Sequence, residues 1–296
     1  MQIFVHNATS VSIRQNACTE AETLGAKIVP CDIPQELAQA YPISIVPTIL
    51  VFNGQNFEDG RGIGREEFYA QLPKMKALPT TAAPSAGSYM KAYEHLLGSG
   101  YDTVVSVHLS SILSGAINNA RTGAQRFNGR VQHVDSEQLS MGIGYQVLAG
   151  AEAARQGASL EEVLSVMADT RARVRVFAML STLEYIHRSG RLSWAEANVG
   201  ELLQLKPFVT LRNGAPSRYG EARTRKKGIQ RLYKILAELG PLERLTILHT
   251  NPPDDAREMA AKFAAQTSHP PMVVQATPII GTHLGPNGLG FAAVVR

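Results

Sequence analysis

The fold is decided by the stretch L-P-T-T-A-A-P-S-A-G-S-Y (78–89) and, after an amphipathic segment, by Y-D-T-V-V-S-V-H-L-S-S-I-L-S-G (101–115). Within the second segment, residues 103–109 form an apolar run rich in β-branched side chains. Such a run is typical of a buried strand in a parallel sheet. We therefore predict a parallel α/β sheet that contains this segment as a buried strand.

Hydroxyl side chains cluster in both segments. Thr80 and Thr81 stand between two prolines, and Ser110 and Ser111 follow directly after the predicted strand. In open α/β sheets, ligands bind beyond the carboxyl ends of the strands. We therefore expect both clusters to lie at the mouth of one sheet, where hydroxyls can donate to and accept from a carboxyl group. The alternative is that these residues only cap helices.

Predicted strands and helices alternate along the chain, which favours a doubly wound parallel sheet. The order of these elements also indicates a second α/β region after about residue 173. The elements that matter below are a helix-capping box of Asp32 with Gln35, a strand over 43–52, a hairpin at 53–54, a helix over 89–98 capped by Ser85 or Ser88, a helix over 112–127, a Ser159–Glu162 cap, a helix over 194–203 and a glycine-rich loop over 281–290.

Charge is distributed unevenly, although the net charge is only +4. The segment 171–234 holds fourteen of the basic residues and four acidic ones. This bias indicates that the second half meets an anionic group, such as a carboxylate, a phosphate or an acidic partner. Nucleic acid is the disfavoured partner because aromatic residues, which stack on bases, make up only 6% of the chain.

Two cysteines, Cys18 and Cys31, show neither metal-binding spacing nor a disulfide framework, which fits a reducing cytoplasm. The first residues lack the features of a secretory signal. The longest apolar run, 43–52, is too short to span a bilayer, so we expect no stable membrane insertion. No phosphate-binding glycine fingerprint is present, and no metal or cofactor is predicted.

Six blocks of sequence resemble the DegV family. They occur in the family's order from about residue 28 to residue 295. The blocks are P-T-T-A-A-P-S (79–85), L-S-S-I-L-S-G (109–115), L-E-Y-I-H-R-S-G-R-L-S (183–193), L-L-Q-L-K-P (202–207), A-R-T-R-K-K (222–227) and G-T-H-L-G-P-N-G-L-G (281–290).

The resemblance implies two α/β domains. Residues 1–160 would form an N-terminal α/β/α domain with a doubly wound parallel sheet, and residues 161–296 a two-layer domain with a mixed sheet. A long-chain fatty acid such as palmitate would lie in a buried tunnel between these domains. The first 31 residues depart from the family, because its T-D-S loop is missing there.

The resemblance also implies which residues bind the fatty acid. One Thr of P-T-T and one Ser of L-S-S, taken here as Thr81 and Ser111, would hold its head group, with Thr80, Ser110 and His283 beside them. In family members that serve fatty acid kinase, a separate ATP-binding subunit phosphorylates the bound acid, a step of phospholipid metabolism. Arg191 and Arg223 would then face that subunit, and the chain itself would carry no catalytic residue.

Two enzymatic alternatives stay open. Ser111 as a hydrolase nucleophile requires a base, and His108 lies inside the predicted strand, where a structural histidine is the better interpretation. The G-x-S-x-G motif is also missing. The second alternative is a stand-alone enzyme acting on a small acyl or hydroxy-ketone substrate, which predicts activity of the purified chain without a partner.

Overall fold

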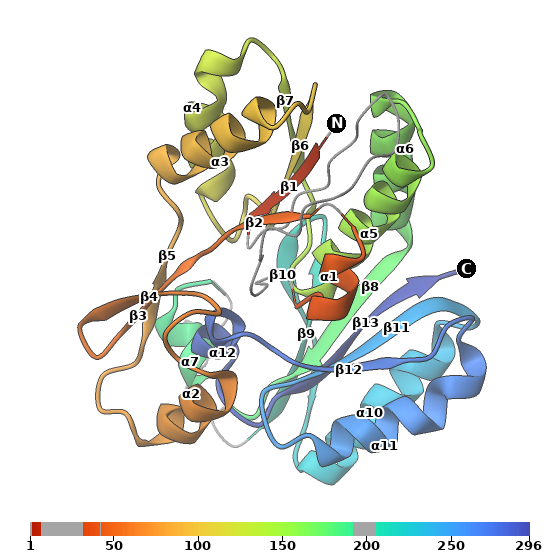
Figure 1. Cartoon of the computed structure of the whole chain (residues 1–296). Helices are drawn as coiled ribbons and strands as arrows, with labels where there is room; N and C mark the ends of the chain where they lie inside the picture. Colours follow the sequence, from red (N-terminus) through yellow and green to blue (C-terminus); the bar gives the residue numbers. More distant parts are fainter. Residues whose placement is uncertain (1, 7–31, 42, 192–204) are drawn as a thin grey trace. The chain divides into compact units, whose positions relative to one another are not determined.

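The computed structural model describes residues 2–6, 32–41, 43–191 and 205–296 (Figure 1). The chain divides into two compact units that interleave along the sequence, whereas the sequence suggested a single boundary near residue 160. The first unit comprises Met1–Ile49, Glu58–Arg61 and Ala82–Ala172, and the second comprises Leu50–Phe57, Gly62–Thr81 and Arg173–Arg296.

The first unit is built on a four-stranded sheet in which every pairing is parallel. Its strand order confirms the doubly wound prediction, with the strand predicted over 103–109 at an inner position. The strands, in their order across the sheet, are β2 (Ser44–Val46), β1 (Gln2–His6), β6 (Val104–His108) and β7 (Val131–Asp135).

Helices cover both faces of this sheet (Figure 1). On one face, α3 (Ala86–Gly98) packs beside α4 (Ala116–Ala124) and buries Tyr89 and Tyr93 completely. On the other face lies α5 (Met141–Arg155), whose first seven residues are all buried. The remaining helices of this unit are α1 (Gln35–Gln39), α6 (Leu160–Arg173) and a 3₁₀ turn at Gln125–Phe127.

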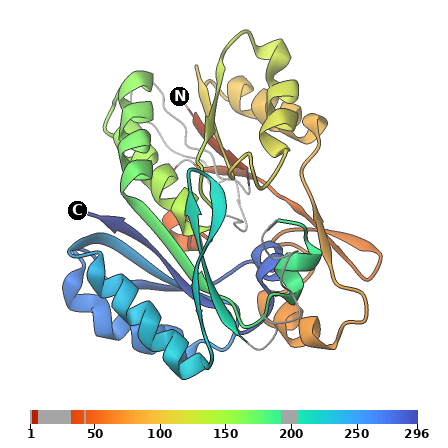
Figure 2. The ribbon, with the colours of Figure 1, turned by 180° about the vertical axis from the view of Figure 1, so that it is seen from behind.

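The second unit contains a six-stranded mixed sheet, in agreement with the predicted two-layer domain. Among the strands that the structure describes in this sheet, β11 and β12 pair in parallel and the other neighbours pair antiparallel. Helices α10 (Arg225–Glu238) and α11 (Asp254–Phe263) lie side by side over one face (Figure 2). The strand order is β10 (Ala215–Ala222), β9 (Lys206–Arg212), β8 (Val174–Met179), β13 (Leu289–Val295), β11 (Leu242–His249) and β12 (Met272–Gln275).

A small three-stranded sheet supports the segment that carries the two threonines. Its order is β4 (Gln55–Glu58), β3 (Ile49–Phe52) and β5 (Thr80–Ala82). The β3–β4 hairpin turns at Asn53 and Gly54, which both have positive φ, as the sequence predicted. Other short elements are α2 (Arg65–Gln71), α7 (Glu184–Arg188), α12 (Pro278–Leu284) and the 3₁₀ turns Leu72–Lys74 and Ala264–Gln266.

Several local predictions were wrong. The apolar run 43–52 is two strands in different sheets, since Pro47 cannot donate to a ladder and separates β2 from β3. Asp32 caps no helix; it is buried and accepts a hydrogen bond from the Ser140 hydroxyl, 2.5 Å away. Helix α4 begins at Ala116, four residues later than expected.

The two hydroxyl clusters do not belong to one sheet, because Thr80 and Thr81 lie on β5 and the serines follow β6. The predicted 281–290 loop is also partly helical, since α12 contains the first four of its residues. The helix predicted over 194–203 lies outside the described residues.

Two predicted caps are confirmed. The Ser85 hydroxyl accepts a hydrogen bond from the Ser88 amide at 3.1 Å and begins α3. Ser159 and Glu162 bond each other reciprocally at the start of α6, with distances of 3.3 and 2.7 Å. Both caps were readable from sequence because each depends on residues only three positions apart.

A chain of buried polar side chains crosses the first unit beneath α3. The Tyr93 hydroxyl lies 2.8 Å from the Ser106 hydroxyl, which lies 2.8 Å from Nε2 of His108. Nδ1 of His133 on β7 follows, 3.5 Å from the same nitrogen. Burial, assisted by nearby Arg121, lowers the pKa of His133 to about 4. His108 is thus part of the core, as the structural interpretation expected.

The low pKa of His133 predicts that acid destabilises the protein. The unfolded chain takes up a proton near pH 6.5, whereas the folded chain does so only near pH 4, so stability falls as the pH drops through this window. We expect a loss of about 2 kcal/mol from this group, after allowing for partial exposure of its ring. Urea unfolding of the wild type and of His133→Gln at several pH values measures it. Parallel stability curves for the two proteins would contradict the prediction.

Candidate functional site

The candidate site contains a direct contact between two motifs that lie far apart in the sequence. Oγ1 of Thr81, on β5, lies 3.0 Å from Nε2 of His283, on α12. These residues are separated by 202 positions. Thr81 is half-buried, while Thr80, one step along the strand, is exposed. Of the two threonines, Thr81 is therefore the one that the fold directs to His283.

Two glycines set the position of His283 on its short helix. A Cβ at Gly281 would lie 2.6 Å from the Tyr69 hydroxyl, so the lack of a side chain lets the helix approach that ring. Tyr69 in turn donates to the carbonyl oxygen of Ala276, 3.0 Å away. Gly285 ends the helix with φ of 75°, at a point where a Cβ would lie 2.3 Å from the Tyr185 ring.

The electrostatic environment keeps His283 neutral. Burial, assisted by the positive charge of Arg191, lowers the pKa of His283 to about 4. Its Nδ1 atom is buried and has no hydrogen-bond partner within the described ranges. The ring therefore has one nitrogen engaged with Thr81 and a second nitrogen with unused hydrogen-bonding capacity. A neutral imidazole of this kind recognises a ligand by hydrogen bonding and not by charge.

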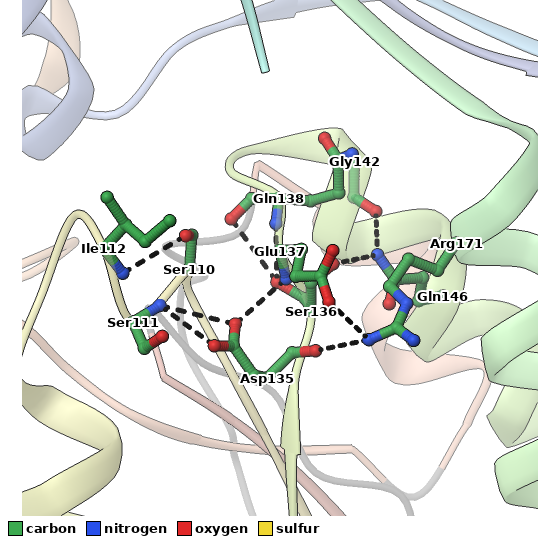
Figure 3. Close-up of polar contacts among 10 residues, drawn as sticks. All are labelled: Ser110, Ser111, Ile112, Asp135, Ser136, Glu137, Gln138, Gly142, Gln146 and Arg171. Atoms are coloured by element: carbon green, nitrogen blue, oxygen red, sulfur yellow. Dashed lines mark hydrogen bonds and ion pairs between the residues drawn. The ribbon is translucent and has the colours of Figure 1, made fainter. Parts of the chain in front are cut away.

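A second polar region, called here the serine corner, consists of Ser110 and Ser111 in the loop after β6 (Figure 3). Ser110 is buried, and its hydroxyl accepts a hydrogen bond from the Ile112 amide at 3.4 Å. Ser111 is exposed, and its hydroxyl bonds to no other residue in the part of the chain that the structure describes. Ser110 thus organises the loop, whereas the Ser111 hydroxyl is available to a ligand.

Two residues of this corner were not identified from the sequence. The Asp135 carboxylate, at the end of β7, accepts hydrogen bonds from the Ser111 amide at 3.2 and 3.3 Å. Arg171, on α6, donates to the Asp135 carbonyl oxygen at 3.1 Å and to the Glu137 carboxylate at 3.2 Å. The available sequence signal was an acidic residue at the end of the short segment V-Q-H-V-D (131–135).

The basic residues predicted to face a partner differ in their surroundings. Arg191 donates to the carbonyl oxygen of Ser189, and Arg223 is exposed just before the Thr224 cap of α10. Arg225 forms an ion pair with Asp255 at 2.6 Å and donates to the Asn287 carbonyl oxygen, also at 2.6 Å. Within the basic run, Arg225 is therefore a structural residue, while Arg223 is accessible.

Within the described ranges, no group of His, Cys, Asp and Glu side chains is arranged to hold a metal ion. No helix in the same part of the chain is both long and apolar enough to cross a membrane.

The structure is that of an α/β protein of two units with hydroxyl residues on β5 and after β6. Comparison with known proteins shows which family has this architecture. The family model described as uncharacterised proteins of the DegV family matches residues 30–296. Protein DegV of Bacillus subtilis is 33% identical over 265 residues, which cover 88% of this chain and 94% of that protein. The chain belongs to the DegV family, as its sequence motifs indicated.

Solved structures support the same assignment. The chain resembles a fatty-acid-binding DegV family protein from Thermus thermophilus with a TM-score of 0.83 and 31% identity, covering 90% of this chain and 96% of that one. It also resembles DegV, a fatty acid binding protein from Bacillus subtilis, with a TM-score of 0.79 and 30% identity over 89% and 95% of the two chains. The fold is therefore that of fatty-acid-binding relatives.

The setting of His283 makes a spectroscopic prediction. In a titration followed by NMR, we expect its ring signals to stay constant from pH 8 to pH 5 and to shift with a midpoint near pH 4. Arg191→Gln should raise this midpoint, because a neighbouring positive charge opposes protonation. A wild-type midpoint near 6.5, the value of an exposed histidine, would contradict the burial of this ring.

Proposed function

We propose that this protein binds one long-chain fatty acid, such as palmitate, and holds its carboxyl group with the hydroxyls of Thr81 and Ser111 beside His283. The observation that carries the proposal is the 3.0 Å contact of Thr81 with His283, which joins two of the family's motifs in one polar corner. The fatty-acid-binding relatives of similar fold support the ligand class. Thr80 and Ser110, each one position before one of these two hydroxyl residues, complete the proposed set of binding residues.

The chemistry of these side chains suits a protonated carboxyl group. A carboxyl group enclosed with a hydrocarbon tail loses hydration, which raises its pKa and favours the neutral acid. Hydroxyls can both donate to and accept from such an acid. His283 is neutral as well, so this corner needs no charged partner for the head group.

The tail supplies most of the binding free energy in this proposal. Transfer of about fourteen methylenes from water to an apolar channel, at about 0.8 kcal/mol each, amounts to roughly 11 kcal/mol before the costs of binding. Each hydroxyl contact contributes about 1 kcal/mol net. The main role of the head-group residues is therefore to position the carboxyl group, while the tail provides most of the affinity.

We further propose that the bound acid is presented to a separate ATP-binding fatty acid kinase subunit. That subunit would transfer the γ-phosphoryl group of ATP to a carboxyl oxygen, giving an acyl phosphate and ADP. The sequence has no phosphate-binding glycine fingerprint of its own, which is consistent with a binding role. Arg191, close to His283, and the exposed Arg223 would face the nucleotide-bearing partner.

A first experiment tests the ligand. Denaturing mass spectrometry of the protein purified from lipid-replete cells should detect one long-chain fatty acid per chain. The single variant Thr81→Val should weaken binding of hexadecanoic acid by about fivefold, the equivalent of one lost hydroxyl contact. Thr122→Val is the matched control, because its hydroxyl bonds only to the carbonyl oxygen of Asn118 on the exposed side of α4. Absence of any fatty acid would refute the proposed function.

A second experiment tests the placement of the carboxyl group. The double variant Thr81→Ala with Ser111→Ala should retain its fatty acid, because the tail dominates affinity, yet lose acyl phosphate formation with ATP and the kinase subunit. Wild-type chain with ATP alone should form none. Unchanged turnover in the double variant would contradict the head-group assignment while leaving fatty acid binding intact.

A further inference from the structure

We propose that Asp135 is the residue that positions Ser111 for the head group, and so determines the preference for a carboxylic acid over other head groups. This inference rests on the proposed function. It concerns a residue at the end of β7 that touches Ser111 only through the loop backbone. Asp135 is therefore a positioning residue and not a ligand-binding one.

The Asp135 carboxylate joins two loops at the carboxyl edge of the parallel sheet (Figure 3). Its Oδ1 accepts from the Glu137 amide at 3.0 Å, which closes a turn in its own loop. Both oxygens accept from the Ser111 amide in the neighbouring loop, at 3.2 and 3.3 Å. An ionised carboxylate suits this role because both of its oxygens are acceptors only.

The turn at Asp135 is itself fixed. Glu137 has a positive φ of 53°, a conformation that few non-glycine residues adopt without support. Arg171 supplies support from α6 by donating to the Asp135 carbonyl oxygen at 3.1 Å. The carboxylate that holds Ser111 therefore projects from a backbone that is anchored on both sides.

Backbone bonds also connect the two loops, but none of them involves the Ser111 amide. The Ser136 amide donates to the His108 carbonyl oxygen at 3.0 Å, and the Ser110 amide donates to the Gln138 carbonyl oxygen at 3.1 Å. The amides of Leu113 and Ser114 also donate to the Ser110 carbonyl oxygen, at 2.9 and 3.1 Å, and form a turn around Ser111, but none of these backbone bonds uses the Ser111 amide. Within the described residues, the Asp135 carboxylate is the group that holds the Ser111 amide, and thereby the position from which the Ser111 side chain projects.

Substitution at Asp135 should change head-group selectivity more than overall binding. Asp135→Ala removes both acceptors, whereas Asp135→Asn keeps one oxygen and places an amide NH₂ against the Ser111 amide. We expect Asp135→Ala to weaken binding of hexadecanoic acid by about fivefold, the equivalent of losing the one hydroxyl contact of Ser111, and Asp135→Asn by about threefold. Binding of 1-hexadecanol, which has the same tail without a carboxyl group, should change by less than twofold in both variants.

The control is Glu137→Gln, which removes one negative charge from the same loop and leaves the Asp135 carboxylate in place. It should retain the wild-type ratio of acid to alcohol affinity. Thermal unfolding and hydrogen exchange accompany each titration; the Ser111 amide should exchange faster in both Asp135 variants. If Asp135→Ala does not fold, Asp135→Asn alone carries the test.

The outcomes separate this inference from the proposed function. Wild-type protein that does not bind hexadecanoic acid refutes the proposed function. Wild-type protein that prefers the acid, with Asp135 variants that keep the same preference, refutes the positioning role alone. Equal losses for acid and alcohol also refute it, because they indicate general structural damage.

Discussion

The hydrogen bond between Thr81 and His283 is the contact on which the polar corner depends, and it is made possible by close packing elsewhere. A bond between residues 202 positions apart forms only if both backbones are fixed independently. β5 is fixed by pairing with β3, and α12 by the rings of Tyr69 and Tyr185 that pack against its two glycines. The glycines flanking His283 are thus part of the site, although they contact no ligand.

In the serine corner, hydrogen bonds and not close packing hold the backbone in position. Parallel pairing of β6 with β7 brings the two following loops together, and the Asp135 carboxylate then links them. Its contacts are with backbone amides, so this link between the loops does not depend on the identity of Ser111. A hydroxyl can consequently be presented to solvent without being used to hold its own loop.

The sequence predicted the elements whose signals are local. A continuous β-branched run identified β6, and the pair of Ser159 and Glu162, three residues apart, identified the cap of α6. Motif resemblance selected Thr81 and His283, but no local signal paired them. The helix α12 was missed because it is a short element stabilised by tertiary contacts, so its glycines predicted a loop. Asp135 was missed because its role exists only once two strands lie side by side.

The two corners have a common feature that explains how a protonated carboxyl group can be recognised. His283 is kept neutral by burial and by Arg191, so it adds no charge to the corner where Thr81 lies. Asp135 is charged, but its oxygens are occupied by amide groups and hold the loop. The hydroxyl of Thr81 is oriented by its bond to His283, and the hydroxyl of Ser111 projects from a loop that Asp135 holds in place. A carboxyl group bound in this way gains little from charge, and the rigidity of the hydroxyls decides where its oxygens lie. Accurate placement, more than strength, is what a ligand held mainly by its hydrocarbon tail requires.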